Sequence, residues 1–377
     1  MEKVCEREIC FGCYSCFNIC PQKAISMNED EYGSIVPVIN KKDCIDCGLC
    51  KSVCPAINTS DFRQPVKTYA SITKDEHDYL STSSGGIATV LSKYVISIGG
   101  VVYGAAFDNE LNLKHCRIEK ENDLEKLKGS KYTQSAINDS YYRVKTDLEN
   151  DIYVLFIGTP CQVDGLLKYL RKEYPKLLTV NLICHGTPNN RLLLEDITTV
   201  HNASPRNKRL SFRNDSEFGL NVTDTEGKRI ISKDFYKDFY FLGFMRKLFY
   251  REACYSCKYA QRSRVGDFTI GDFWGFDHSI PFVSNANHGL SVVLINTEKG
   301  LELFDFCKHL LHYQERTLDE AVKGNPQLNH PSEKHRNYDR FRNNYKKHGF
   351  KTAAERSLWF DMIGYKAVFL FQRIMRR

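Results

Sequence analysis

The chain of 377 residues lacks several common signatures of function. It has neither a G-x-G-x-x-G fingerprint nor a G-x-x-x-x-G-K-[ST] loop, which excludes a standard dinucleotide-binding motif and a P-loop. No apolar run reaches the length of a transmembrane helix, because the most apolar stretch, residues 357–371, contains Asp361 and Lys366. Residues 1–8 are charged and do not resemble a signal peptide. We therefore expect a cytoplasmic protein.

Cysteine, in contrast, is abundant, with 15 residues in a chain that is expected to stay in a reducing compartment. Eight of them form two runs of the pattern C-x-x-C-x-x-C-x-x-x-C-P, typical of a bacterial ferredoxin with two 4Fe-4S clusters. In this pattern the fourth cysteine of each run binds the cluster of the other run. The spacing thus predicts two ligand sets: Cys10, Cys13, Cys16 and Cys54 for one cluster, and Cys44, Cys47, Cys50 and Cys20 for the other.

Zinc and disulfides are the alternatives for these eight cysteines. Four thiolates complete a zinc shell, and zinc sites usually consist of two separated C-x-x-C pairs, so a triple run is atypical. Disulfides would require an oxidising compartment. Between the runs, residues 25–38 are typical of a short hairpin, and the polar stretch 59–65 is typical of a linker. Residues 1–60 are therefore expected to form a small domain of the bacterial ferredoxin fold.

A small-residue loop at residues 81–86 precedes a helical pattern, with apolar residues three or four positions apart from Ile87 to Ile98. Ser83 or Ser84 is the expected N-cap, and residues 101–107 are expected to form a strand. A loop of this kind at a helix N-terminus can bind an anion, because free N–H groups and the helix dipole face the ligand. An ordinary capped helix explains the same residues.

From Asp151 the chain alternates strand, helix and strand. Residues 152–157 and 177–183 are apolar runs separated by a helical pattern at residues 162–173, which predicts two adjacent parallel strands. Cys161 and Cys184 each follow one of these strands and should therefore meet at one edge of the sheet. Together with the C-x-x-C pair Cys254 and Cys257, they predict a third 4Fe-4S cluster. Zinc, or a catalytic Cys161 assisted by His185, is the alternative. The remaining Cys5, Cys116 and Cys307 are expected to be ordinary small apolar residues.

The C-terminal part is basic. Residues 331–351 contain seven Lys or Arg and two acids, with interleaved aromatic residues. Beyond them a helical face ending at Arg376 and Arg377 is predicted from the apolar residues Leu358, Trp359, Met362, Ile363, Val368, Phe369, Leu370 and Ile374. This segment could lie on an anionic membrane surface, dock onto a partner protein, or pack on the body of the chain. Nucleic acid is not an expected partner, because no nucleic-acid-reading fold accompanies the patch.

Taken together, these motifs resemble the coenzyme F-420 hydrogenase/dehydrogenase beta-subunit family, in a form fused to an N-terminal two-cluster ferredoxin. The resemblance spans about Cys10 to Leu311. Its carriers are the cysteine runs, Ser83-Ser84-Gly85-Gly86, Gly99 to Gly104, Gly129-Ser130-Lys131-Tyr132, Gly158-Thr159-Pro160-Cys161-Gln162, Cys184-His185-Gly186, the pair Cys254 and Cys257, and Gly271-Asp272-Phe273-Trp274.

The resemblance implies FAD and a third cluster beside it. Carried over onto this sequence, the family pattern implies flavin contacts from Ser83, Ser84, Gly85, Gly86, Lys131, Tyr132, Gly158, Thr159, Pro160 and Gln162. The expected fold is a ferredoxin domain followed by an α/β flavin-binding region with a mostly parallel sheet. Its expected divisions are residues 1–60 for the ferredoxin, 66–148 for an FAD-associated domain, 149–312 for a domain with the third cluster site, and 313–377 for the basic tail.

The predicted function is that of an iron-sulfur flavoprotein oxidoreductase. Electrons would pass between a ferredoxin-type donor and a conjugated small molecule, deazaflavin-like or other, through the clusters and FAD. Flavin suits this junction because clusters move single electrons whereas hydride chemistry moves pairs. The alternative is an electron-transfer subunit that has no substrate of its own and docks onto a partner enzyme.

Overall fold

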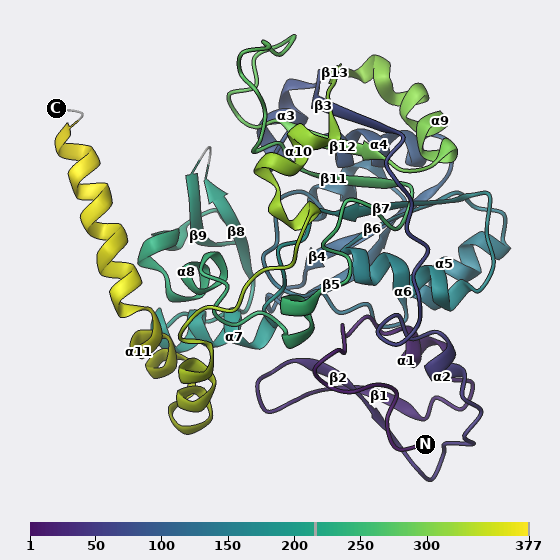
Figure 1. The fold of residues 1–377 in the computed structure, drawn as a ribbon, viewed down its shortest axis with the longest axis horizontal. Coiled ribbons are helices and arrows are strands. Elements are labelled where there is room, and N and C mark those ends of the chain that lie inside the picture. Colours follow the sequence, from purple (N-terminus) through teal and green to yellow (C-terminus); the bar gives the residue numbers. More distant parts are fainter. Residues whose placement is uncertain (215–216, 376–377) are drawn as a thin grey trace.

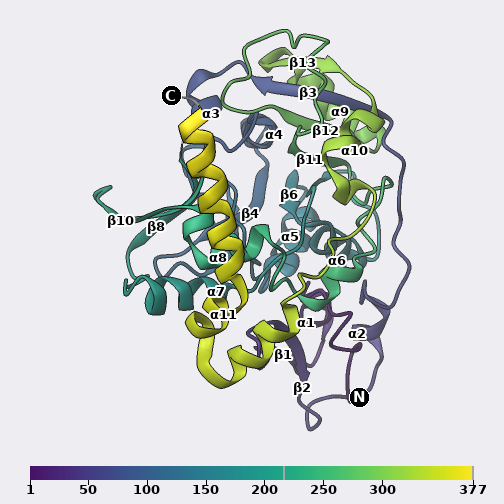
Figure 2. The same ribbon diagram turned by 60° about the vertical axis from the view of Figure 1, so that its left-hand side comes forward.

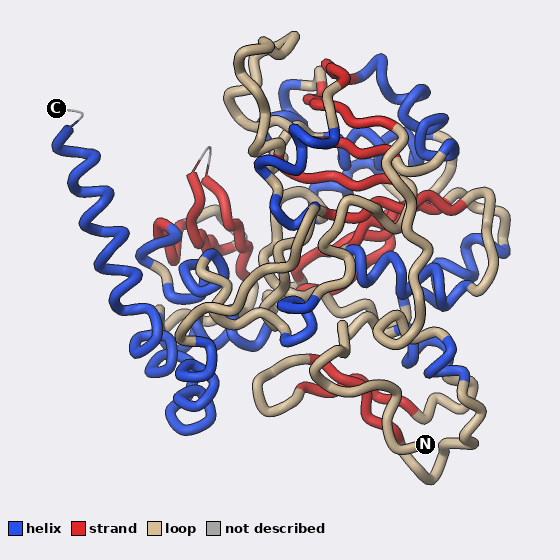
Figure 3. Tube along the Cα trace, in the orientation of Figure 1, coloured by secondary structure: helices blue, strands red, loops and turns tan. Residues whose placement is uncertain are grey.

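The computed structural model describes residues 1–214 and 217–375. Within these residues the strands form three sheets, of two, three and eight strands. The N-terminal region with the two-stranded sheet lies below the large sheet in Figure 1, and the C-terminal helix lies at the far left, beyond the three-stranded sheet. Figure 3 shows how much of the chain between these sheets is loop. The first cysteine run and the helix that carries Cys161 lie where the N-terminal region meets the large sheet.

The N-terminal region has a hairpin and two short helices. Strands β1 (Ile25–Glu29) and β2 (Ile35–Ile39) pair antiparallel with Ile25 opposite Ile39, which confirms the hairpin expected at residues 25–38. Helices α1 (Ser15–Ile19) and α2 (Leu49–Ser52) lie within the two cysteine runs. Each begins after a residue with positive φ, Tyr14 at 66° and Gly48 at 76°, so the chain turns sharply where the cysteines must converge.

The large sheet has the strand order β13-β3-β12-β11-β7-β6-β4-β5. Its centre is parallel and consists of β4 (Val101–Phe107), β6 (Val154–Gly158), β7 (Leu177–Leu182) and β11 (Phe268–Asp272). Antiparallel strands flank this centre: β5 (Leu113–Ile118), β12 (Ser291–Ile295), β3 (Lys67–Thr73) and β13 (Leu311–Glu315). The expected adjacency of the strands before Cys161 and Cys184 is confirmed.

The expectation of a mostly parallel sheet is wrong, because the sheet is mixed. Strands β4 and β5 are joined by the short turn 108–112, and β11 and β12 by the loop 273–290 without a crossover helix, so both connections reverse the chain. The divisions expected at 148/149 and 312/313 also do not separate folded units. Strands from both sides of residue 149 pair in this sheet, and β13 crosses residue 312.

Helices cover both faces of the large sheet. On one face α4 (Ile87–Ser97) and α9 (Glu298–Cys307) pack through Leu91 and Phe304 against Val102 and Leu155. On the other face α5 (Ser140–Glu149) and α6 (Pro160–Leu170) pack against Val101, Tyr103 and Phe156. The residues in β4 and β6 alternate between the two cores, as the two-residue period of a strand requires. The expected N-cap of α4 is wrong, because Gly86 caps the helix in place of Ser83 or Ser84.

A second, smaller layer holds the antiparallel strands β8 (Lys208–Asn214), β9 (Glu217–Asp224) and β10 (Arg229–Asp234). Helices α7 (Asn190–Glu195), α8 (Phe239–Met245) and α11 (Tyr338–Met375) pack with them around a core that includes Phe212 and Leu220. The π-helical turn η2 (Asp196–Val200) directly extends α7. Figure 2 shows α11 passing in front of α7 and α8. No motif in the sequence predicted this unit.

Helix α11 is interrupted at Gly349, whose φ of 74° breaks the helical path. After it, Leu358 and Met362 are buried in the small core, whereas Trp359 is 55% exposed and Phe360 73% exposed. The predicted apolar face is thus divided between the body of the chain and the surface. The side chains of Phe369, Leu370 and Ile374, and all of Arg376 and Arg377, lie outside the described residues.

Short elements complete the fold. They are α3 (Glu76–Ser81), η1 (Glu121–Lys126), η3 (Phe235–Lys237), η4 (Glu252–Ser256), η5 (Lys308–Leu310), α10 (Leu318–Gly324) and η6 (Pro326–Leu328). Among the helices that the structure describes, none combines the length and hydrophobicity needed to cross a membrane.

The packing of α4 predicts a stability effect. Leu91 is completely buried on the sheet-facing side of this helix. Truncation in Leu91→Ala should lower the free energy of unfolding by about 2–5 kcal/mol, through lost burial and an unfilled cavity. The measurement is anaerobic urea denaturation followed by circular dichroism. The control Ile98→Ala, at an exposed position beside the same helix, should stay within about 0.5 kcal/mol of the wild type; equal losses in the two variants would contradict the packing described.

Candidate iron-sulfur and cofactor sites

Two cavities in the N-terminal region divide the eight cysteines of the paired runs. One is lined by Cys10, Cys13, Cys16 and Cys54. The other is lined by Cys20, Cys44, Cys47 and Cys50. This is the division that the crossed ligand pattern requires, since each cavity receives one cysteine from the other run. The role of these cysteines as cluster ligands stays a prediction, and we name the two cavities the inner and the outer ferredoxin site, respectively.

Cys5 lies beside the inner ferredoxin site, although sequence analysis grouped it with the ordinary cysteines. Its thiol lines the same cavity as Cys10 and Cys54. Hydrogen bonding to Cys5 lowers the pKa of Cys10 to about 6, and the charge of Arg251 acts in the same direction. Cys5 had no partner at ligand spacing in the sequence, so only the folded chain shows this contact. Cys307, in contrast, is buried in an apolar core as expected.

The four cysteines of the predicted third cluster come together at the carboxyl edge of the large sheet. Cys161 lies in the first turn of α6 directly after β6, and Cys184 follows β7. Cys254 lies in η4 and Cys257 caps it. The pKa of the Cys161 thiol is raised well above its usual value by burial, and the negative charges of Cys184, Cys257 and Cys254 add to this effect. Burial also raises the pKa of Cys184 to about 12 and that of Cys257 to about 11.

The spacing of these sulfur atoms bears on the choice between zinc and a cluster. A single Zn²⁺ ion with Zn–S bonds of about 2.3 Å holds its sulfur atoms about 3.8 Å apart. Among the described residues, the groups whose ligand atoms all lie within 4.8 Å of one another include no set of these cysteines. A cubane of four irons needs a wider arrangement of thiolates, because each thiolate binds a different iron, and the third cluster stays a prediction. We refer to this set as the sheet-edge site.

The inner ferredoxin site packs directly against the sheet-edge site. Ser15 Oγ donates a hydrogen bond of 2.9 Å to the carbonyl of Gly165 in α6. Glycine is needed at this position, since a Cβ would lie 2.6 Å from Ser15 Oγ and 3.2 Å from Cys13 Cβ. Lys258, next to Cys257, donates to the carbonyls of Pro55 and Asn58. The hydrogen bonds of Lys258 therefore join the segment after Cys54, in the inner ferredoxin site, to the segment after Cys257, in the sheet-edge site.

Arg251 is a second link between these sites. Its buried guanidinium donates to the carbonyl of Cys10 at 3.1 Å and to that of Ile35 at 2.8 Å, and it also bonds Gln134. The charge of Arg251 also acts on the Cys254 thiol, whose pKa is nevertheless raised by burial. One positive charge thus lies near both sets of sulfur atoms. Cys47 of the outer ferredoxin site, by contrast, is exposed to solvent.

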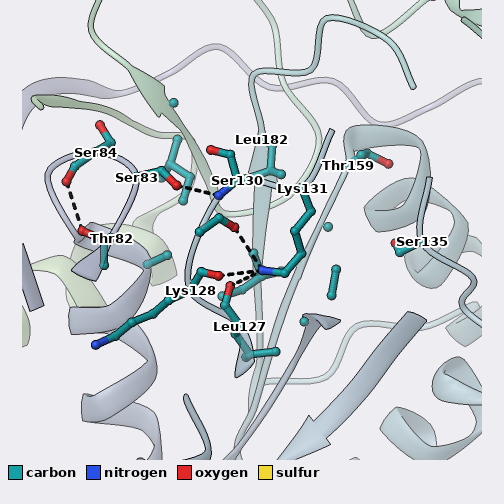
Figure 4. Close-up of a pocket in the computed structure, with 18 of the residues that line it drawn as sticks. Thr82, Ser83, Ser84, Leu127, Lys128, Ser130, Lys131, Ser135, Thr159 and Leu182 are labelled. Carbon is teal, nitrogen blue, oxygen red and sulfur yellow. Dashed lines mark hydrogen bonds between the residues drawn. The ribbon is translucent and has the colours of Figure 1, made fainter. Parts of the chain in front are cut away.

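A cavity of about 280 Å³ adjoins the sheet-edge site and includes Cys161 in its wall. This volume is near the lower end of the range of about 300–1,000 Å³ found for ligand pockets. Its apolar wall comes from Ile87, Leu113, Leu124, Leu127, Ile157, Leu182 and Ile270, and its polar wall includes Thr82, Ser83, Ser84, Lys128, Ser130, Lys131, Thr133 and Ser135. Figure 4 shows the serine loop and the Lys131 segment facing each other across part of this cavity.

The predicted flavin contacts are placed as follows. Ser83, Ser84, Gly86, Lys131, Gly158, Thr159 and Gln162 line the cavity. Gly85, Tyr132 and Pro160 are not among its lining residues, and packing explains each of them. A Cβ at Gly85 would lie 2.0 Å from the carbonyl of Ser71, Tyr132 stacks on Phe244 in the small core, and Pro160 is the first residue of α6.

Backbone and side-chain donors gather at the serine loop. Gly86 has a φ of 82°, so the chain enters α4 with its first N–H groups unpaired by a side-chain cap. Ser83 Oγ accepts a hydrogen bond of 2.5 Å from the Ser130 N–H. Lys131 Nζ donates to the carbonyls of Leu127, Lys128 and Gly129 at 2.8–3.0 Å (Figure 4), and burial lowers its pKa to about 8. The donors of Lys131 are thus already paired, and it is the N–H groups at the start of α4 that suit a phosphate-bearing ligand whose apolar part lies on the opposite wall.

Two features of the cavity escaped sequence analysis. His115 lies in its wall, with Nε2 3.0 Å from the Ile157 carbonyl and Nδ1 3.0 Å from Ser135 Oγ, and burial lowers its pKa to about 4. Asp272 also lines it and pairs with Arg213 at 2.5 Å. A lone histidine in a strand carries no local signal. Asp272 stood within a family motif, but its partner Arg213 comes from the unanticipated small sheet.

Comparison with known proteins agrees with this architecture. Residues 152–320 match the family described as the C-terminal region of the coenzyme F420 hydrogenase/dehydrogenase beta subunit, and residues 9–57 match the 4Fe-4S dicluster domain. A solved chain of the F420-reducing [NiFe] hydrogenase complex from Methanosarcina barkeri, in a xenon-derivatised crystal, is similar over 72% of this chain and 92% of that chain. The TM-score is 0.50 and the sequence identity 17%, so this likeness shows the fold alone.

Two curated proteins are similar to short segments of the chain. An uncharacterised polyferredoxin-like protein of Methanocaldococcus jannaschii is 34% identical over 67 residues, which are 16% of this chain and 40% of that protein. A protein named ferredoxin 7Fe from Hydrogenibacillus schlegelii is 44% identical over 50 residues, which are 13% of this chain and 58% of that protein. The chain thus spans about half the length of the curated relatives that it matches.

The fold and the comparisons together define the class of this protein. The chain is an iron-sulfur protein in which a dicluster ferredoxin domain is joined to a mixed α/β sheet. Its residues 152–320 match the family of the coenzyme F420 hydrogenase/dehydrogenase beta subunit, which confirms the resemblance that its motifs indicated.

The geometry of the sheet-edge site predicts the effect of removing one ligand. Cys254→Ser should lower the iron content by about four per chain, from about twelve to about eight, because a cubane that loses a thiolate is released. The measurement is anaerobic iron and acid-labile sulfide analysis. The control Cys116→Ser, at a cysteine outside the three sites, should keep all the iron. An unchanged iron content in Cys254→Ser would remove the third cluster from the assignment.

Arg251 provides a prediction on reduction potentials. A unit charge within about 8 Å of a cluster is worth about 2 kcal/mol at an effective dielectric constant of about 20. Because a positive charge favours the reduced, more negative cluster, Arg251→Gln should lower a midpoint potential by roughly 100 mV or less. The measurement is an EPR-monitored redox titration of all clusters. Arg209→Gln, in the small sheet, is the control; an unchanged set of potentials in Arg251→Gln would mean that its charge is screened from the clusters.

Proposed function

We propose that the protein is an iron-sulfur flavoprotein oxidoreductase that passes electrons between a ferredoxin-type donor and a conjugated small molecule. The observation that carries the proposal is the position of Cys161, which belongs to the sheet-edge site and also lines the adjoining cavity. A cofactor in this cavity would therefore lie next to the last cluster of a chain of three. Electron transfer in either direction is compatible with this arrangement.

The order of the three sites follows from their contacts. Cys47 is exposed, so the outer ferredoxin site is the one that outside redox proteins can approach. The inner site contacts α6 through Ser15 and Gly165, and α6 carries Cys161 near its start. The path therefore runs from the outer site to the inner site, then to the sheet-edge site and to the cavity. Clusters of this kind need a reducing environment, which favours the cytoplasm as the location.

The residues around the cavity fit FAD. FAD exchanges single electrons with a cluster and electron pairs with an organic substrate. Ser84 and the N–H groups that follow Gly86 would hold its negatively charged phosphates near the N-terminus of α4, and Lys131 lines the same cavity. The apolar wall with Ile157 and Ile270 would bind its ring system and exclude water. Two further wall residues, Gly104 and Gly271, leave room for the side chains of Leu127 and Ile183, which pack against them.

The chain's own residues can also orient an acceptor. Arg213 pairs with Asp272 at the cavity and donates to the hydroxyl of Tyr132 at 3.2 Å, and its guanidinium lies 4.6 Å from the centre of the Phe218 ring. Trp274, which is half-exposed, lies against Phe218 with a ring separation of 6.0 Å. Aromatic and guanidinium faces of this kind stack well on a flat conjugated molecule. We therefore propose a conjugated acceptor, deazaflavin-like or other.

A second candidate function is electron delivery to a partner enzyme. The observation that favours it is the exposed aromatic pair Trp359 and Phe360 on α11, next to the basic segment 331–351. Exposed aromatic residues beside positive charge are typical of a contact surface, for a partner protein or for an anionic membrane. In this case the cavity would hold the cofactor, but no small acceptor would be reduced.

One experiment tests the proposal and separates it from the alternative. Anaerobically purified protein should contain about one FAD per chain, and after reduction by dithionite and removal of the excess, the flavin should be reoxidised by a small deazaflavin or a related conjugated acceptor. The measurement is stopped-flow absorbance at the flavin band. Reoxidation only by a partner protein would favour the subunit function, and absence of flavin would overturn the proposal.

A matched pair of variants tests the cavity as the flavin site. Ala88→Trp places a large side chain in the cavity wall at the start of α4 and should lower the flavin content at least tenfold while the iron content stays at the wild-type value. Ser97→Trp, at the exposed end of the same helix, should keep both. A full flavin content in Ala88→Trp would place the cofactor elsewhere.

A further inference from the structure

A buried cluster of three side chains lies in the small layer and is not used by the redox sites. Asp196 is the first residue of the π-helical turn η2, His201 follows this turn, and Asp238 caps the N-terminus of α8. One ligand atom from each of the three lies within 4.8 Å of the others. His201 Nε2 is 2.8 Å from Asp238 Oδ2 and 3.3 Å from Asp196 Oδ2.

The π-helical turn explains why Asp196 and His201 meet. Its hydrogen bond runs over five residues, from the His201 N–H to the Asp196 carbonyl at 3.2 Å. In an α-helix two residues five positions apart point in different directions, whereas the wider π turn brings them nearly above each other. Such turns are uncommon and frequently occur at functional sites. The turn thus presents one carboxylate and one imidazole side by side.

Asp196 is completely buried and has an ion-pair contact with His201, but it has no well-formed hydrogen bond among the described residues. Asp238 differs, because its Oδ1 accepts a hydrogen bond of 2.6 Å from the Phe241 N–H and its Oδ2 faces the cluster. Buried polar atoms without a partner are rare and call for an explanation such as an ion.

We propose that Asp196, His201 and Asp238 bind a divalent transition-metal ion, with Zn²⁺ as the representative. The separations of 2.8 and 3.3 Å between the ligand atoms are those of a coordination shell with bonds of about 2.0–2.2 Å, the usual values for Zn–N and Zn–O. Two carboxylates would balance the charge of the ion. The His201 side chain is 10% exposed, which leaves a route for the ion and a place for a water ligand.

The ion would connect η2 to the start of α8, and α8 supports the wall beside the flavin cavity. Tyr240 in α8 donates a hydrogen bond of 2.9 Å to the carbonyl of Tyr132, and Phe244 stacks on the Tyr132 ring at 4.6 Å. Tyr132 is the neighbour of Lys131 in the cavity wall. The ion would therefore stabilise the packing of α8 against Tyr132, and this role does not depend on the proposed redox function.

The experiment uses the complete protein, purified anaerobically with its clusters. After equilibration with Zn²⁺ and removal of free ion, zinc and iron are counted by mass spectrometry, and the zinc environment is measured by X-ray absorption at the zinc edge. We expect about one zinc per chain with nitrogen and oxygen ligands, including one imidazole. Asp196→Asn should lose about one zinc per chain and keep its iron, and the exposed control Asp305→Asn should keep both.

Three outcomes would overturn the proposal. Zinc bound only by sulfur would show capture by free thiols such as Cys5. Zinc in equal amounts in the wild type, Asp196→Asn and His201→Gln would place the ion at another site. Absence of zinc from the wild type would mean that His201 is an imidazolium ion held between the two aspartates. If the variants do not fold, the wild type alone tests the proposal: about one zinc per chain with nitrogen and oxygen ligands supports the site, and any other zinc content or ligand shell contradicts it.

Discussion

The parallel pairing of β6 with β7 is the constraint on which the rest of the redox architecture depends. Because Val154 pairs with Leu177 and the strands run in the same direction, their carboxyl ends reach the same edge of the sheet. Cys161 and Cys184 are the residues that follow these ends. The helix α6, which completes the crossover between the two strands, also carries the surface against which the ferredoxin domain packs. One connection therefore brings together the sheet-edge site, the cavity and the inner ferredoxin site.

The contact between ferredoxin and sheet is close because small residues allow it. Gly165 has no room for a Cβ beside Ser15 and Cys13, and the peptide carbonyls of Cys10, Pro55 and Asn58 accept hydrogen bonds from Arg251 and Lys258. These bonds join backbone carbonyls to the buried Arg251 and the partly buried Lys258, so the two units are held in one orientation. A flexible tether would leave the separation of the clusters variable. The fold instead keeps the inner site against α6, which is what electron transfer between clusters needs.

The small layer with the three-stranded sheet supplies contacts that support the wall of the cavity. Its strands were not anticipated, because the stretch between residues 190 and 250 alternates less clearly and carries no cysteine. Nevertheless it supplies Arg213 to Asp272, the aromatic stack around Tyr132, and the cluster of Asp196, His201 and Asp238. It also anchors α11, in which Leu358, beyond the break at Gly349, is completely buried. The wall of the cavity away from the ferredoxin therefore depends on residues that have no motif of their own.

The amino-acid sequence by itself determined the two cysteine runs, because the first three cysteines of each run lie so close in sequence that their sulfur atoms can converge, and their crossed division followed from the ferredoxin pattern. It also determined the hairpin at residues 25–39 and the strand-helix-strand unit around Cys161, whose periodic patterns are local. Only the tertiary structure decided that the large sheet is mixed, that Gly85 and Tyr132 lie outside the lining of the cavity, that Cys5 lies beside Cys10, and that Asp196 meets Asp238. Each of these results depends on a contact between segments far apart in the chain, and no local pattern of side chains encodes which distant segment will supply the other half.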